Sequence, residues 1–145
     1  MSHRAKITVM AADIITFATP PTLPPAHGYS HVASIGPGHR LVWTAGQVPV
    51  AADGTPAPAD DWEAQTRLAM ENVGAALAAA GATWDDVFKL TYYVVDTSAL
   101  DTIRAVRDEF VNVERPPASL LVKVAGLFRP DVLIEIEAIA AVAES

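Results

Sequence analysis

Cysteine is absent from the 145 residues, and so are clusters of basic residues and apolar runs long enough to span a membrane. The missing cysteine excludes disulfides, thiolate catalysis and cysteine-based metal sites. The formal charge of −7, without a run of Lys or Arg, predicts no binding to nucleic acid or to an anionic membrane surface. Because no basic-then-apolar leader is visible either, we expect a cytoplasmic protein.

Apolar residues, by contrast, are abundant. They make up 51% of the sequence, and the mean hydropathy is +0.26. The chain is long enough for one hydrophobic core, and nothing in it resembles a linker between two cores, so we expect a single domain over residues 1–145. One such domain would struggle to bury this much apolar surface alone, which predicts contacts between subunits.

Turn residues and hydrophobic periodicity predict an α+β sandwich. Residues 1–28 form an N-terminal strand and a proline-rich connector in this interpretation. Strands over 29–35 and 40–47 should pair as a hairpin around Gly36-Pro37-Gly38. Helical spacing predicts helices over 60–80 and 100–111, and β-rich runs predict strands over 89–96, 118–124 and 132–142. Two helices should cover one face of a mixed, mainly antiparallel sheet.

Two of these strands carry mixed faces. Alternation puts Ser119 on one face with Leu121 and Lys123. In the last strand one face is wholly apolar and should lie under the helices: Val132, Ile134, Ile136, Ala138 and Ala140. The opposite face mixes Leu133, Glu135, Glu137 and Ile139. We expect the face of Ser119 and the face of Glu135 both to turn toward a partner subunit and to line a cleft.

Three segments resemble one known family, the reactive intermediate deaminase (Rid) family, also catalogued as endoribonuclease L-PSP. They are TAGQVP (44–49), EAQTRLAMENVGAALAAAGATWDDVFKLTYYVVD (63–96), and PPASLLVKVAGL (116–127) followed by LIEIEAIA (133–140). The resemblance covers 29–142. It implies a chorismate-mutase-like protomer, a homotrimer around a central barrel, and a small-molecule site in each intersubunit cleft. It also implies hydrolysis of enamines and imines, such as 2-aminoacrylate, to keto acids and ammonia, and we expect no cofactor.

One position departs from the pattern that the resemblance implies. Active members have Pro-Ala-Arg-Ser at the proline corner, and that arginine clamps the substrate carboxylate. Here Pro117-Ala118 is followed by Ser119. Glu135 falls on the position of the family's cleft glutamate, where it can carry the proton of the attacking water. From the residues alone, the alternative is a structural carboxylate paired with Lys123.

The resemblance implies further cleft residues. Tyr29, Gly46 and Tyr93 fall on cleft positions, and Leu121 shares a face with Ser119. The two tyrosines either stack on a planar ligand or fill the interface. Arg129, in the loop before the last strand, either replaces the missing cation or is a solvated loop residue.

Two other groups are expected to be unremarkable. His27 and His31 lie four residues apart, outside any helix and without a third ligand, so we expect no metal site. Arg104 and Arg107 should form a solvated helix flank with neighbouring acids.

Two functions follow from these residues. The first is a hydrolase of the deaminase type that acts on an imine or enamine but is not an efficient 2-aminoacrylate or 2-iminoacid deaminase, because Ser119 replaces the clamp. The second is a non-catalytic trimer that uses the same cleft to bind a small metabolite or a partner. A ribonuclease is disfavoured, since the sequence has no basic groove.

Overall fold

A computed structural model describes residues 14–144 and has the α+β architecture that the sequence predicts. The elements are β1 (Ile15–Ala18), β2 (Val32–Ile35), β3 (His39–Trp43), α2 (Trp62–Ala79), the 3-10 turn η1 (Trp84–Asp86), β4 (Val87–Val94), α3 (Leu100–Arg107), β5 (Ala118–Lys123) and β6 (Ile134–Ala143).

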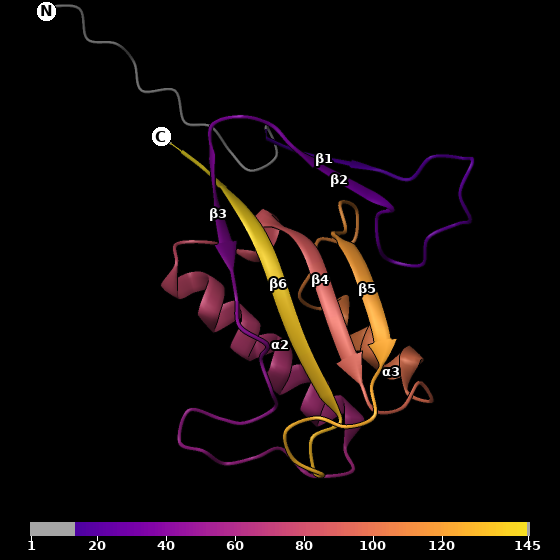
Figure 1. The fold of residues 1–145 in the computed structure, drawn as a ribbon, viewed down its shortest axis with the longest axis vertical. Helices are drawn as coiled ribbons and strands as arrows, with labels where there is room; N and C mark the ends of the chain where they lie inside the picture. The colour runs from indigo at the N-terminus through magenta and orange to yellow at the C-terminus, as the bar shows by residue number, and fades with distance from the viewer. Residues whose placement is uncertain (1–13, 145) are drawn as a thin grey trace, which may run out of the picture.

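The main sheet has the strand order β3-β6-β4-β5, with both helices on one face (Figure 1). β6 pairs antiparallel with β3 and with β4, whereas β4 and β5 run parallel. A parallel pair needs a crossover connection, and α3 provides it here. The expectation of a mixed, mainly antiparallel sheet is therefore confirmed, and β5 is an edge strand.

The core lies between this sheet and α2. All five apolar residues of the face predicted for the last strand are buried, from Val132 to Ala140. Helix α2 opposes them with a completely buried stripe at helical spacing: Ala69, Met70, Val73 and Leu77. The helix begins after Asp61, whose side chain accepts a hydrogen bond from the Ala64 amide, and it ends before Gly81, which has a φ of +75°.

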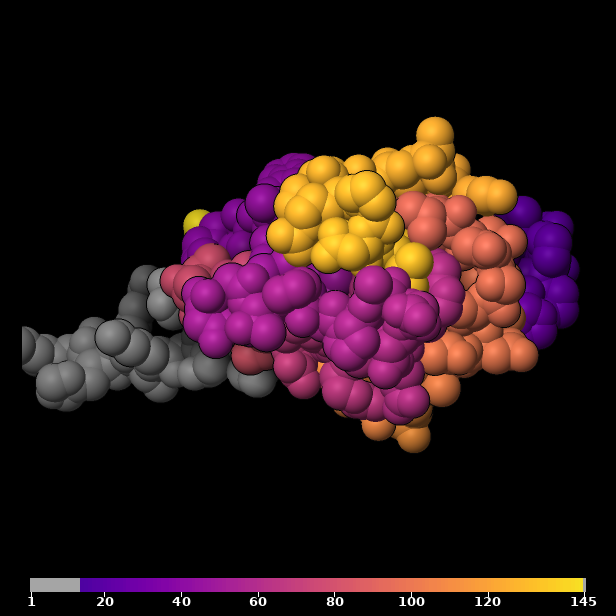
Figure 2. Space-filling view, turned by 90° about the horizontal axis from the view of Figure 1, so that it is seen from below, coloured from indigo at the N-terminus to yellow at the C-terminus, as the bar shows by residue number. Residues whose placement is uncertain are grey.

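The loop before β6 is anchored to α2 by Gln65. The Gln65 Nε2 donates to the Asp131 carbonyl over 2.8 Å, and the Leu133 amide donates to the Gln65 Oε1 over 2.8 Å. Figure 2 shows this loop, in orange and yellow, lying against the magenta surface of α2. Within residues 14–144, no helix combines the length and the hydropathy needed to cross a membrane.

The predicted hairpin between 29–35 and 40–47 is wrong. β2 pairs antiparallel with β1 in a separate two-stranded sheet, and β3 pairs with β6 (Figure 1). The small sheet has its own apolar contact with the end of β6, where Ile14 and Ile15 pack on Ala141. Burial of these residues favours the β1 pairing over the local turn. Residues 1–13 of the predicted N-terminal strand and connector lie outside the described part of the chain.

Candidate functional site

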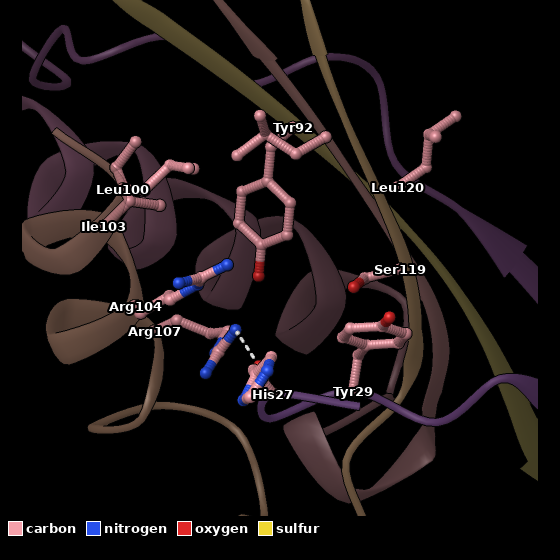
Figure 3. Close-up of a pocket in the computed structure, with 10 residues that line it drawn as sticks. His27, Tyr29, Tyr92, Leu100, Ile103, Arg104, Arg107, Ser119 and Leu120 are labelled. Atoms are coloured by element: carbon pink, nitrogen blue, oxygen red, sulfur yellow. Dashed lines mark hydrogen bonds between the residues drawn. The ribbon is translucent and has the colours of Figure 1, made fainter. Parts of the chain in front are cut away.

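The proline corner before β5 is held by the N-terminal connector. The Ser30 amide donates to the Pro117 carbonyl over 3.1 Å, and the Ser30 hydroxyl donates to the Pro116 carbonyl over 2.6 Å. Ser30 also forms a parallel β-bridge with Ala118. This docking places Tyr29 beside Ser119, as Figure 3 shows.

A cavity of about 260 Å³ opens beside Ser119, between β5 and α3 (Figure 3). Its polar lining combines Tyr29 and His27 from the connector, Tyr92 from β4, Arg104 and Arg107 from α3, and Ser119 from β5. Its apolar lining includes Leu100, Ile103, Leu120 and Leu121. We call this space the α3 cavity.

Arg107 is buried in the wall of the α3 cavity, with only 9% of its surface exposed. Its Nε donates to the Asp108 Oδ1 over 3.0 Å, and its Nη1 donates to the His27 carbonyl over 3.3 Å. The guanidinium packs so closely on Gly28 that a β-carbon at that residue would collide with it. Arg107 is therefore a buried cation in the cavity wall. The expectation that it lies on a solvated flank of the helix is wrong.

Tyr92 presents its hydroxyl to the same cavity. The side chain is 3% exposed, and the hydroxyl has no hydrogen-bond partner among the described residues. Burial raises the pKa of Tyr92 far above its usual value, and the nearby Arg107 offsets only part of this effect. The hydroxyl thus remains a protonated donor. In Figure 3 it points between the arginines of α3 and Ser119.

Glu135 lies in a second cluster, on the helix-free face of the sheet. It is the register partner of Tyr93, and its carboxylate packs on Gly46. The Tyr93 hydroxyl donates to the Glu137 Oε1 over 2.8 Å. This hydrogen bond, followed by burial and the charges of both glutamates, raises the pKa of Tyr93. Gly46, Tyr93 and Glu135 thus lie together, and we call them the carboxylate cluster, whereas Tyr29, which the resemblance assigns to the same cleft, lies with Ser119.

The expectation that Ser119 and Glu135 share one face of the sheet is wrong. Ser119 is the register partner of Leu90, whose side chain is in the core under the helices. Glu135 pairs with Tyr93, on the opposite face. Because residues paired across strands project to the same side, the two site residues lie on opposite faces within one chain.

The alternative ion pair between Glu135 and Lys123 is excluded by the same register. β5 pairs with β4 and not with β6, and Lys123 is the partner of Val94 on the helix-covered side.

A further candidate, Arg129, lies away from both groups. The Arg129 Nε donates to the Asp131 Oδ1 over 3.0 Å, and its guanidinium lies over the Phe128 ring. Arg129 is therefore tied to its own loop and lies outside the α3 cavity. No group of three potential metal ligands is present within residues 14–144.

The helix-free face is apolar around the carboxylate cluster. Trp43, on β3, is 65% exposed, and Leu41 and Leu120 on the same face are also exposed. Large exposed apolar side chains beside a charged cluster are typical of an interaction surface.

Sequence reasoning missed Arg107 and Tyr92. A signal existed for Tyr92, because strand alternation places it opposite Tyr93 and therefore under the helices. No signal in the sequence marks Arg107, whose burial depends on the docking of Gly28 against α3.

A family model, curated relatives and solved structures all match this chain. The family model described as endoribonuclease L-PSP matches residues 19–142. A 2-iminobutanoate/2-iminopropanoate deaminase of Salmonella typhimurium is 42% identical over 102 residues, which cover 69% of this chain and 78% of the relative. The crystal structure of the Rid-family protein YyfB from Yersinia pestis matches with a TM-score of 0.81 at 35% identity, over 88% of this chain and 98% of that one. TdcF of E. coli with bound serine matches with a TM-score of 0.63 at 34% identity, over 90% and 99% of the two chains.

Proposed function

Because the chain belongs to the Rid family, also described as endoribonuclease L-PSP, we propose that it is a cytoplasmic hydrolase that deaminates a small imine or enamine. The observation that carries this proposal is the carboxylate cluster, in which Glu135 is held against Gly46 beside Tyr93. Residues 1–145 act as one domain in this proposal, and the enzyme needs no cofactor.

Imine hydrolysis requires a positioned water and a group that moves its proton. The water oxygen bonds to the imine carbon while Glu135 accepts a proton from the water. Glu135 then returns this proton to the nitrogen, which gives a carbinolamine. Glu135 next carries the proton of the carbinolamine hydroxyl to the same nitrogen, the carbon–nitrogen bond breaks, and ammonia leaves together with a carbonyl product. The Glu135 side chain is regenerated, so the hydrolysis consumes only the imine and water.

The preferred substrate does not carry a carboxylate on its imine carbon. Ser119 offers at most one neutral hydrogen bond where the family resemblance implies an arginine. A hydrogen bond to a charged group is worth about 1.5–3 kcal/mol, which is a factor of roughly 10 to 150 in affinity. We therefore expect poor activity on 2-aminoacrylate and other 2-imino acids.

The active form is a homotrimer with a central barrel, and its sites lie in the intersubunit clefts. Support comes from the exposed Trp43 and Leu120 on the helix-free face. It also comes from the sheet itself, because Ser119 and Glu135 lie on opposite faces of one chain. The two residues can serve one ligand only if two protomers supply them. Sedimentation equilibrium should give three times the chain mass of 15.3 kDa, and a monomer would remove the cleft.

A coupled assay tests the reaction. Imines are generated from amino acids by an amino-acid oxidase, or from primary amines by an amine oxidase, and ammonia release is followed. We expect acceleration with the amine-derived imines, little with the 2-imino acids, and no acceleration with Glu135→Gln.

Subunit mixing tests whether the site is shared. Trimers are reassembled from equal amounts of Glu135→Gln chains and Ser119→Phe chains, each inactive alone. A site shared by neighbouring protomers regains about a quarter of the wild-type activity in random trimers, since half of the chains supply each intact face. A site built within one chain regains none.

The alternative function is a trimer that binds a small metabolite without turning it over. The α3 cavity favours this alternative, because Glu135 is not among the residues that line it. Binding of a small acid without acceleration of any imine hydrolysis would select it.

A further inference from the structure

We infer that the α3 cavity is a carboxylate site in which Arg107, Arg104 and the Tyr92 hydroxyl hold the anionic end of the ligand against α3. The substrate class is then an organic acid whose imine or enamine carbon lies several bonds from the carboxylate. The reacting group in this inference rests on the proposed function, whereas the carboxylate site itself does not.

The charge of the cavity wall is the first argument. The chain carries 17 acidic residues against 10 Lys and Arg, yet within residues 14–144 two arginines line this cavity and no Asp or Glu does. Arg107 is buried, and its carboxylate partner Asp108 lies outside the lining. Arg104 is exposed and forms no ion pair among the described residues. Asp108 pairs with Arg107 from outside the cavity, whereas Arg104 has no such partner among the described residues, so the cavity wall presents positive charge that favours an anionic ligand.

The unpaired hydroxyl of Tyr92 is an independent argument. A buried donor without an acceptor destabilises the fold, and phenylalanine would fill the same space without that cost. The hydroxyl points into the cavity between the two arginines and Ser119 (Figure 3). A carboxylate oxygen is the acceptor that would satisfy this hydroxyl and a guanidinium together.

The position of the cations sets the shape of the ligand. Both guanidinium groups come from α3, across the cavity from the short side chain of Ser119 on β5. A ligand whose carboxylate lies against α3 must span the cavity before its other end reaches β5. The 260 Å³ volume has room for roughly eight water-sized groups of about 30 Å³ each. Leu100, Ile103 and Leu121 line it with apolar surface that suits a short methylene chain.

Calorimetric titration of the purified protein with simple carboxylates tests the site without any turnover. The probes are propionate, butyrate, pentanoate and hexanoate, with hexanamide as the uncharged control. We expect one site per chain and an affinity that rises about fourfold for each buried methylene, the equivalent of 0.8 kcal/mol. Hexanamide should bind at least tenfold more weakly than hexanoate.

Three variants test which side chains donate hydrogen bonds to the bound carboxylate. Arg104→Met and Tyr92→Phe should each weaken hexanoate binding about fivefold or more, and Arg107→Met at least tenfold. The control is Arg67→Met, which removes a partly exposed arginine on α2 that pairs with Glu63 and Glu109, outside the cavity. Arg107→Met removes a buried group and this variant can fail to fold. In that case Arg104→Met and Tyr92→Phe test whether the cavity binds the carboxylate. Unchanged hexanoate binding in both, or equal binding of hexanamide, overturns the inference.

Turnover then tests the substrate class separately. An amine oxidase converts 4-aminobutanoate and 6-aminohexanoate to imines remote from the carboxylate, with oxygen as the oxidant. We expect faster ammonia release with these imines than with the 2-imino acids, and loss of that advantage in Arg104→Met. If hexanoate binds at the α3 cavity and no imine is hydrolysed, the carboxylate site stands and the proposed deaminase activity fails. If imines are hydrolysed and hexanoate does not bind, the carboxylate site fails alone.

Discussion

Gly46→Ala moves Glu135 without altering its chemistry. A β-carbon on Gly46 would lie 2.9 Å from the Glu135 Cδ and 3.0 Å from its Oε1, whereas ordinary contacts begin at 3.4 Å. The carboxylate must therefore retreat by about 0.5 Å, the difference between 3.4 and 2.9 Å. Since a misplacement of 1 Å can cost about 100-fold in rate, we expect imine hydrolysis to fall roughly tenfold.

The fold should tolerate this substitution. Gly46 does not have a positive φ, and the atoms that must move belong to the end of a flexible side chain. We expect the free energy of unfolding to change by less than about 1 kcal/mol. The matched control is Gly126→Ala, because in the described part of the chain no atom beyond its two chain neighbours lies within 4 Å of a β-carbon at Gly126, and its φ is not positive. Full turnover by a correctly folded Gly46→Ala protein would show that the position of Glu135 does not matter, and would refute its role as proton carrier.

Four other changes have defined outcomes. Tyr92 has a raised pKa in the folded state, so the stability it contributes is present below pH 10 and is lost as the pH rises above the unfolded value of 10.0. Urea unfolding between about pH 9 and 11.5 should show a loss of up to about 1.4 kcal/mol per pH unit in wild type beyond that in Tyr92→Phe, and parallel curves would contradict this assignment. Gln65→Leu leaves the carbonyl and amide groups on either side of Val132 without their buried partner and should cost about 3 kcal/mol or more in urea unfolding. Ser119→Arg adds a guanidinium to a cavity that already holds Arg107, so we expect lower stability and a gain of 2-iminoacid binding in calorimetry. Trp43→Asp puts a charge on the exposed helix-free face and should yield monomers in sedimentation experiments, and an intact trimer would place the interface elsewhere.

The parts of the fold that depend on local patterns were predictable. The alternation from Val132 to Ala140 identified the buried face of β6, and all five residues are in the core. The spacing of apolar residues identified α2, whose stripe packs on that face. Of the residues that the family resemblance assigns to the cleft, the structure brings Gly46, Tyr93 and Glu135 together and places Tyr29 with Ser119.

The parts that depend on register between distant segments were not predictable. Alternation shows which residues of β5 share a face, and it does not show which side of the sheet that face meets. The side of the sheet on which Ser119 lies is fixed by its parallel pairing with Leu90, and a shift of the register by one residue would put Ser119 on the other side. The turn at Gly36-Pro37-Gly38 likewise suggested a local hairpin, whereas the apolar contact of β1 with the end of β6 determines the pairing of β2.

In the proposed function, one ligand must contact both the α3 cavity, which binds its carboxylate, and Glu135, which moves the proton of the attacking water. These two groups lie on opposite faces of the sheet. The residues that line the α3 cavity belong to one chain, and the carboxylate cluster lies on the other face of the same sheet. In the main sheet β5 is an edge strand, so a neighbouring protomer can approach there and bring its own helix-free face toward the cavity. Carboxylate binding should therefore persist in an isolated chain, whereas imine hydrolysis should require the assembly. The proposed trimer would therefore be part of the catalytic machinery, because it would supply Glu135 to a ligand that another chain already holds.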